Sequence, residues 1–335
     1  MFDVSFLLIL IIIVALIFDF TNGAHDCANA IATVVSTKVL SPRTAVIMAA
    51  TLNLIGAFLG TKVANTLGSG IVHPDIVANC QPLVLAALIG AIGWNLFTWH
   101  FGIPSSSSHA LIGGLMGAAV AYAGFSSLNG GSILTKILLP LVLSPLAGFG
   151  MGLLVMFLIM FLCAKCARNK LNTAFTRLQV LSAAFMATSP GTNDAQKTMG
   201  VITLALFIFN EIETIAVPLW VKCLCATFMA LGTAMGGWKI VKTMGHKIFK
   251  LEPVHGFASE TSAALVISGA SLLGAPISTT HTITACIFGV GSTKRLTAVR
   301  WGVAGHLIIA WVLTIPAPGL LAACSFFLLN AVGFA

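Results

Sequence analysis

The chain has 335 residues, of which 58% are hydrophobic and only 8% are charged, and its mean hydropathy is +1.02. Soluble domains carry roughly a quarter charged residues, so this composition excludes a water-soluble fold. In a bilayer only helices and closed barrels satisfy their backbone polar groups, and the continuous apolar runs of this chain do not alternate as barrel strands do. We therefore expect an all-α polytopic membrane protein with ten to twelve membrane segments, at about 20 residues per crossing.

The first apolar run covers residues 7–18, and Asp3 is the only charge before it. A secretory signal peptide would carry a basic segment at this place, so we interpret the run as the first transmembrane helix. The eight cysteines include a lone CxxC pair, Cys163 and Cys166, with no second pair to complete a tetrahedral zinc site. The sequence therefore predicts no structural metal and no cofactor.

The formal net charge of +8 comes from basic residues that gather in alternate connections between apolar segments. Thirteen of the 17 Lys and Arg residues lie in four connections, at 38–43, 165–177, 239–250 and 294–300. The intervening connections contain none, at 67–80, 124–132 and 210–214. By the positive-inside rule the basic connections are cytoplasmic, which places both termini outside. The charge thus reports orientation in a lipid membrane and gives no reason to expect a nucleic-acid partner.

A duplicated motif organises the chain. The run GIPSSSSH at 102–109 returns as GAPISTTH at 274–281, and GAHD at 23–26 returns as GTND at 191–194. The two motifs keep their order and nearly their spacing, so we expect a first repeat at 1–164, a cytoplasmic basic linker at 165–177 and a second repeat at 178–335. The loop charges give each copy an odd number of crossings. The copies are then inverted in the membrane, as in secondary transporters, whose sites lie near the midplane between the repeats.

In each repeat a polar cluster with one aspartate interrupts an apolar helix. The clusters lie at 21–26, which ends on Asp26, and at 189–197, which contains Asp194. Gly and Pro open the backbone, and open backbone at membrane depth is tolerated where it lines a cavity. The pattern predicts broken helices with both carboxylates at a central site. The alternative is that each cluster is a turn at the membrane surface.

The Ser/Thr turns offer hydroxyl donors without negative charge, which suits an anion. A helix that starts at such a turn directs free N–H groups and its positive dipole end at the anion, although an ordinary helix N-cap has the same sequence. Two copies would converge on one oxyanion, whether the turns join full passes or form the tips of re-entrant hairpins. The expected anion-binding residues are Ser105, Ser106, Ser107, Ser108, Ser278, Thr279 and Thr280, with the backbone amides of Gly191 and Thr192.

The run NGAHDCANA at 22–30, the GTND run and the paired P-x-S-S/T-S/T-H turns resemble the inorganic phosphate transporter (PiT) family over essentially the whole chain. The resemblance implies a homodimeric, low-affinity-type symporter of a bacterial plasma membrane, which imports inorganic phosphate, alone or as a metal–phosphate complex, with protons or sodium. It implies phosphate on the Ser/Thr turns and the coupling cation, Na⁺ included, near Asp26, Asn29, Asn193 and Asp194.

His25 favours a proton as the coupling ion. Sodium-coupled relatives usually carry Asn at this position, whereas many proton-linked bacterial relatives carry His, which titrates near neutral pH. Glu260 lies in an apolar segment, is expected either to be protonated or to face the site, and is therefore grouped with the cation- or proton-coupling residues. Lys197 is expected either to pair with Asp194 or to contact the substrate. A sulfate permease of the same fold and an anion channel remain alternatives, and an enzyme is not expected because the polar groups occur in two symmetric copies.

Overall fold

A computed structural model describes residues 4–61, 64, 80–214, 216–273, 275 and 277–333. The described residues form helices joined by turns and contain no β-strand, which agrees with the expected all-α class. Gly274 and Pro276 of the second duplicated motif, and the connection at 67–79, lie outside the described residues. The α-helices are α1 (Val4–Ser36), α2 (Pro42–Gly56), α5 (Pro82–Phe101), α6 (Ser107–Ala123), α7 (Gly130–Ile133), α8 (Leu139–Leu162), α9 (Arg168–Ile208), α10 (Leu219–Met235), α11 (Trp238–Lys242), α12 (Pro253–Leu272), α13 (Thr279–Lys294), α14 (Trp301–Leu313) and α15 (Pro316–Ala331).

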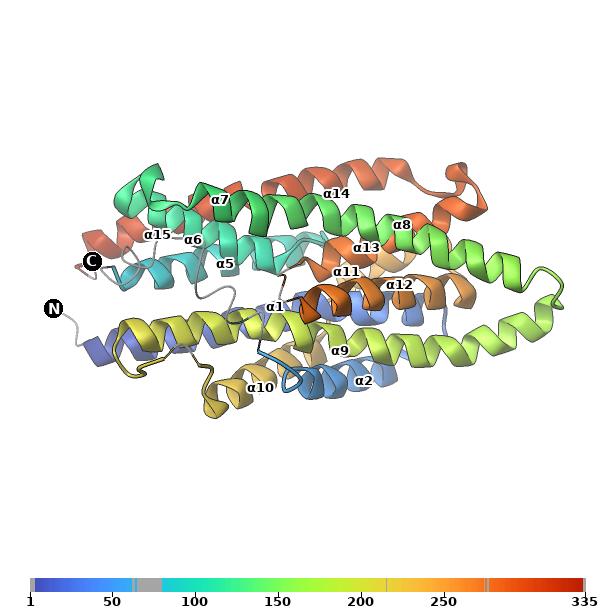
Figure 1. The fold of residues 1–335 in the computed structure, drawn as a ribbon, viewed down its shortest axis with the longest axis horizontal. Coiled ribbons are helices and arrows are strands. Elements are labelled where there is room, and N and C mark those ends of the chain that lie inside the picture. The colour runs from blue at the N-terminus through green and yellow to red at the C-terminus, as the bar shows by residue number, and fades with distance from the viewer. Residues whose placement is uncertain are drawn as a thin grey trace.

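The helices form an elongated bundle in which α1, α8 and α9 run along the long axis (Figure 1). Among the described residues, four segments are long and apolar enough to cross a membrane, at 6–36, 82–101, 139–162 and 301–331, and a bent pair at 219–235 and 238–247 adds a fifth. The protein is therefore a multi-pass membrane protein. The count of ten to twelve membrane segments stays a prediction.

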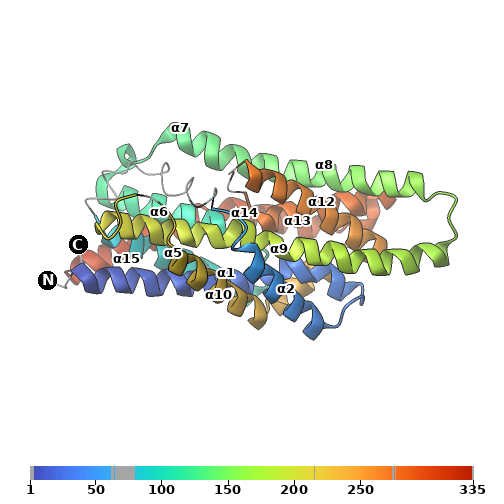
Figure 2. The same cartoon turned by 60° about the horizontal axis from the view of Figure 1, so that its bottom comes forward.

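The basic connections gather at one end of the bundle. The start of α1 and the end of α15 lie together at the opposite end, as do the connections after α6 and after α9 (Figures 1 and 2). The turns after α1, α8 and α13, which carry Lys38, Lys165 and Arg295, lie at the basic end. The structure thus places these basic connections at one end of the bundle and the connections without Lys or Arg after α6 and α9 at the other. The assignment of the basic end to the cytoplasm stays a prediction.

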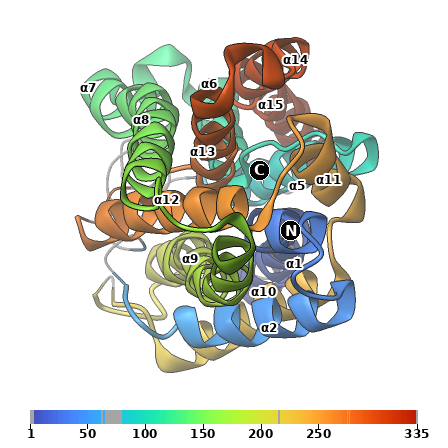
Figure 3. The ribbon, with the colours of Figure 1, turned by 90° about the vertical axis from the view of Figure 1, so that its right-hand side faces the viewer.

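Two helical hairpins, α5–α6 and α12–α13, occupy opposite halves of the bundle, and their turns lie near the middle of the long helices (Figure 1). In the end view, α1 and α9 lie side by side beneath α12 (Figure 3). The helices of the two halves pair crosswise, α1 with α10 and α9 with α2, and α6 with α15 and α13 with α8. This arrangement favours re-entrant hairpins over full passes. The exact repeat boundaries stay predictions.

The predicted breaks in the two long helices are wrong, because α1 and α9 run without interruption through 21–26 and 189–197. The alternative of surface turns fails for the same reason. A Cβ atom on Gly23 would lie 2.2 Å from the carbonyl oxygen of Met229 in α10, and one on Gly191 would lie 2.2 Å from that of Asn53 in α2. These glycines therefore allow close helix packing, as small residues do in membrane bundles, and do not open the backbone.

Candidate functional site

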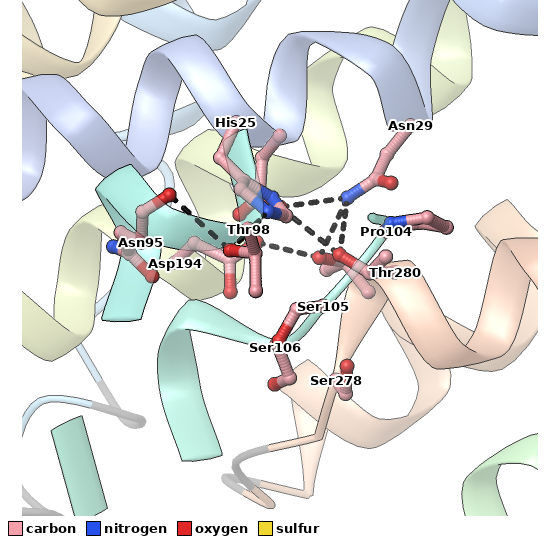
Figure 4. A network of polar contacts seen from close by, with 12 residues as sticks. His25, Asn29, Asn95, Thr98, Pro104, Ser105, Ser106, Asp194, Ser278 and Thr280 are labelled. Carbon is pink, nitrogen blue, oxygen red and sulfur yellow. Dashed lines mark hydrogen bonds and ion pairs between the residues drawn. The ribbon is translucent and has the colours of Figure 1, made fainter. Parts of the chain in front are cut away.

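The centre of the bundle holds a polar cluster that begins on α1. The side-chain amide of Asn29 donates to Asp26 Oδ1 at 2.9 Å and to the hydroxyls of Thr280 and Thr279 at 3.0 and 3.3 Å. Thr280 in turn donates to Asp26 Oδ1 at 3.1 Å. Figure 4 shows His25 and Asn29 on α1 facing Thr280 at the start of α13. The aspartate motif of the first repeat thus meets the hydroxyl turn of the second.

The other half of the cluster has the same form with the repeats exchanged. Asp194 on α9 accepts from Ser108 at the start of α6 at 3.3 Å, and from Thr279 at 3.0 Å. Lys197 Nζ lies 2.5 Å from Asp194 Oδ1, and it also donates to the Ser108 hydroxyl and to the Ile277 carbonyl oxygen, the latter at 3.1 Å. The expected pairing of Lys197 with Asp194 is therefore confirmed. Both aspartates are almost fully buried.

Ser106 and Ser278 are N-caps of α6 and α13. Each Oγ accepts the backbone N–H of the histidine three residues later, His109 or His281, at 3.2 Å. The ring centroids of the two histidines are 5.2 Å apart, which shows that the first turns of α6 and α13 are adjacent. Two helix N-termini, with their positive dipole ends and the first-turn N–H groups that have no partner within the helix, therefore lie together at the centre.

The remaining hydroxyls of the first turn differ in what they contact. Ser105 accepts from the Trp94 indole at 2.8 Å and shares a hydrogen bond of 3.1 Å with Thr314, so it is held by neighbouring helices. Ser107 is buried, and within the described part of the chain its hydroxyl has no hydrogen-bond partner. Buried polar groups are nearly always paired, so Ser107 and the helix N-termini form a place that a polar ligand would complete.

The structure does not bring the Gly191 and Thr192 amides to these hydroxyls. Gly191 faces the backbone of α2, and Thr192 donates its hydroxyl to Ser189 O at 3.0 Å within α9. The expectation that their amides bind the anion assumed a broken helix at 189–197, and α9 is continuous there. In a continuous helix the backbone N–H groups bond within the helix. We therefore leave these two residues out of the anion site.

His25 and Asn193 hold equivalent places, each one residue before its aspartate, but they differ in their contacts. His25 Nδ1 is 3.8 Å from Asp26 Oδ1, and its Nε2 is within hydrogen-bond distance, 3.2 Å, of the Thr98 hydroxyl on α5. Asn193 donates to Ser271 on α12 at 2.9 Å. Only His25 is therefore placed to interact directly with its neighbouring carboxylate.

Glu260 belongs to a second buried cluster. It accepts from Thr33 at 2.5 Å, from the Gln179 amide at 3.1 Å and from Ser182, and it is fully buried. Thr33 follows Asp26 by seven residues on α1, which places this cluster about 10 Å along the helix from the aspartate. The sequence grouped Glu260 with the cation residues and missed Gln179 and Ser182. Thr33 lies two helical turns after Asp26 on the same face of α1, and this spacing is the sequence feature that could have predicted a second polar cluster.

Buried carboxylates beside hydroxyl-lined helix N-termini, at the centre of a crosswise helical bundle, are typical of a multi-pass membrane transporter. The sequence model of the phosphate transporter family matches the chain in two segments, at residues 22–170 and 164–322. The chain therefore belongs to the phosphate transporter family.

Two bacterial relatives and one solved structure show the extent of this similarity. A probable low-affinity inorganic phosphate transporter of Bacillus subtilis is 48% identical over 328 residues, which cover 97% of this chain and 98% of the relative. A relative of the same description from Rhizobium meliloti is 49% identical over 328 residues, with 97% of each chain covered. A solved structure titled the sodium-dependent phosphate transporter matches with a TM-score of 0.87 at 25% identity, over 97% of this chain and 99% of that one.

Proposed function

We infer that this protein is a secondary active symporter that imports inorganic phosphate together with a cation, with the proton favoured as the coupling ion. The observation that carries the inference is the placement of two buried carboxylates, Asp26 and Asp194, among the hydroxyls of two adjacent helix N-termini. The helix ends and hydroxyls suit an oxyanion. The carboxylates suit a cation, and the protein holds both kinds of group within one cluster.

Charge makes the two binding events depend on each other. An unneutralised carboxylate about 5 Å from a phosphate charge is repelled by about 3 kcal/mol at an effective dielectric of about 20. A cation or proton at Asp26 removes this repulsion, and by reciprocity bound phosphate strengthens cation binding by the same factor. This mutual dependence is what symport requires and what a channel does not need.

The side chains around Asp26 bear on the identity of the coupling ion. His25 lies beside Asp26, and its imidazole nitrogens can accept and donate a proton. The oxygen atoms of Asp26, Thr279 and Thr280 would equally suit Na⁺, and the solved relative is named as sodium-dependent. In proteoliposomes we expect uptake of labelled phosphate to follow an inward proton gradient and to stop with a protonophore. Uptake that follows a sodium gradient alone and resists the protonophore would show that the coupling ion is sodium and not the proton.

Substrate identity needs its own test, because hydroxyls and helix N-termini bind either phosphate or sulfate. The names of the bacterial relatives support phosphate and a low-affinity mode of uptake. Excess sulfate should leave the uptake of labelled phosphate nearly unchanged, and equal competition would favour a sulfate permease. Uptake measured with and without Mg²⁺ would test a metal–phosphate complex. We further propose a homodimer in a bacterial plasma membrane, which size-exclusion chromatography with light scattering would test for the dimer.

A further inference from the structure

Besides the pair His25 and Asn193, the two repeats differ at a second position of the central cluster. The repeat offset that aligns Asp26 with Asp194 also aligns Asn29 with Lys197, since each follows its aspartate by three residues. Each donates a hydrogen bond to Oδ1 of that aspartate, Asn29 at 2.9 Å and Lys197 at 2.5 Å. The first repeat therefore has a neutral amide where the second has an ammonium group. Two aspartates in equivalent places of the repeats therefore have neighbours of unequal charge.

The surroundings of Lys197 resemble those of a bound metal cation. Its side chain is only 2% exposed. Its three N–H donors meet three oxygen atoms of different kinds, the Asp194 carboxylate, the Ser108 hydroxyl and the Ile277 carbonyl. Carboxylate, hydroxyl and carbonyl oxygens are also the ligands that hard metal cations prefer. The ammonium group thus lies where the oxygen atoms of the second repeat would otherwise hold a cation.

We propose that Lys197 is a built-in cation that permanently fills the cation site of the second repeat, so that Asp26 alone binds the exchangeable coupling cation. Asp194 and Lys197 together carry no net charge, whereas Asp26 has no basic side chain in the equivalent place. This inference rests on the proposed function and specifies its cation site. One exchangeable cation, and not two, then neutralises the central cluster in each cycle.

A role for Lys197 as a direct phosphate ligand is less consistent with the structure, since all three donors of the ammonium group are already engaged. A purely structural ion pair is the remaining alternative. The two roles differ in what happens when the lysine is replaced. If Lys197 fills a cation site, a small metal cation can bind there once the lysine is removed. If Lys197 only makes a structural contact, no particular cation restores what its removal takes away.

The decisive variant is Lys197→Asn, which gives the second repeat the residue of the first. Lys197→Met keeps the length of the side chain and fills the site without charge. Lys170→Asn makes the same exchange at an exposed position of the same helix, α9, and serves as the matched control. Each purified protein is tested for thermal unfolding and for binding of labelled phosphate, in sodium chloride and in choline chloride of equal ionic strength.

We expect sodium to raise the melting temperature of Lys197→Asn more than that of the unmodified protein, because a cation that binds only the folded state stabilises it. Sodium should also tighten phosphate binding by Lys197→Asn about fivefold or more over choline, which is the lower range of allosteric coupling. Lys197→Met should bind phosphate weakly in both salts, and Lys170→Asn should behave as the unmodified protein does.

A cleaner version uses the Asp26→Asn background, which lacks the exchangeable site. In Asp26→Asn alone sodium should have no specific effect on the melting temperature, and adding Lys197→Asn should restore one. This second pair also serves if the single variant is too unstable to purify. The proposal would be overturned if sodium changed neither the melting temperature nor the phosphate affinity of a folded Lys197→Asn protein. It would also be overturned if Lys197→Met bound phosphate as the unmodified protein does. Failure of the unmodified protein to bind phosphate would instead contradict the proposed function.

Discussion

Gly23→Ala and Gly191→Ala should each disturb the central cluster by forcing two helices apart. The added Cβ would lie 2.2 Å from Met229 O or from Asn53 O, whereas ordinary contact begins at 3.4 Å. Each helix pair must therefore separate by about 1 Å, and overpacking of this kind costs about 1 to 3 kcal/mol. Alanine gains only about 0.5 to 1 kcal/mol over glycine inside a helix. We expect a net loss of up to about 2.5 kcal/mol.

Both glycines lie three residues before an aspartate of the site, so the displacement should also lower phosphate uptake about tenfold or more. The assays are thermal unfolding in detergent and uptake of labelled phosphate into proteoliposomes. Gly150→Ala in α8 and Gly269→Ala in α12 are matched controls, because the added Cβ would have no atom of a neighbouring helix within 4 Å. If the two site variants melt and transport as the controls do, the close packing of α1 with α10 and of α9 with α2 does not position the carboxylates.

Four further substitutions test the hydroxyls and the second cluster. Ser107→Ala should weaken phosphate binding about tenfold, since a hydrogen bond to a charged group is worth about 1.5 to 3 kcal/mol, and an unchanged Kd beside the exposed control Ser126→Ala would exclude this ligand. Glu260→Gln places an amide N–H donor against the hydroxyl donors of Thr33 and Ser182, and should lower the free energy of unfolding by about 1 to 3 kcal/mol. A raised melting temperature would contradict the hydrogen bonds assigned to Glu260. Ser106→Ala and Ser278→Ala should each cost about 1 kcal/mol of stability as lost N-caps, and no change in melting temperature would argue against the capping roles.

The helical class, the duplication and the charged end of the bundle follow from local features of the sequence. Apolar runs, repeated motifs and basic loops predict these features whichever segments pack together in the fold. Whether the long helices are interrupted could not be predicted in this way. A glycine can interrupt a helix or can let a neighbouring helix pack closely against it, and the local sequence is the same in both cases. Gly23 and Gly191 admit α10 and α2, and that contact depends on helices from the other half of the chain.

The candidate site was predictable in its residue types and not in its pairings. Asp26 and Asp194 stood out as charges in apolar segments, and the duplicated hydroxyl turns stood out by repetition. That Asn29 contacts Thr280 from the other repeat is a consequence of the crosswise topology. The Ile277 carbonyl that completes the surroundings of Lys197 is a backbone atom, and its identity leaves no trace in the sequence. Ion-binding oxygens of this kind are visible only in the fold.

Coupled accumulation of phosphate is the measurement that tests the account most directly. Proteoliposomes with the unmodified protein and with Asp26→Asn are given equal external phosphate and an inward cation gradient, and internal phosphate is followed to steady state. The unmodified protein should concentrate phosphate above the external level and lose it when the cation gradient is collapsed. Asp26→Asn should at most equilibrate phosphate, because the charge that makes anion binding conditional on the cation is gone. Accumulation by Asp26→Asn equal to that of the unmodified protein, or mere equilibration by both, would contradict cation-coupled transport through this site.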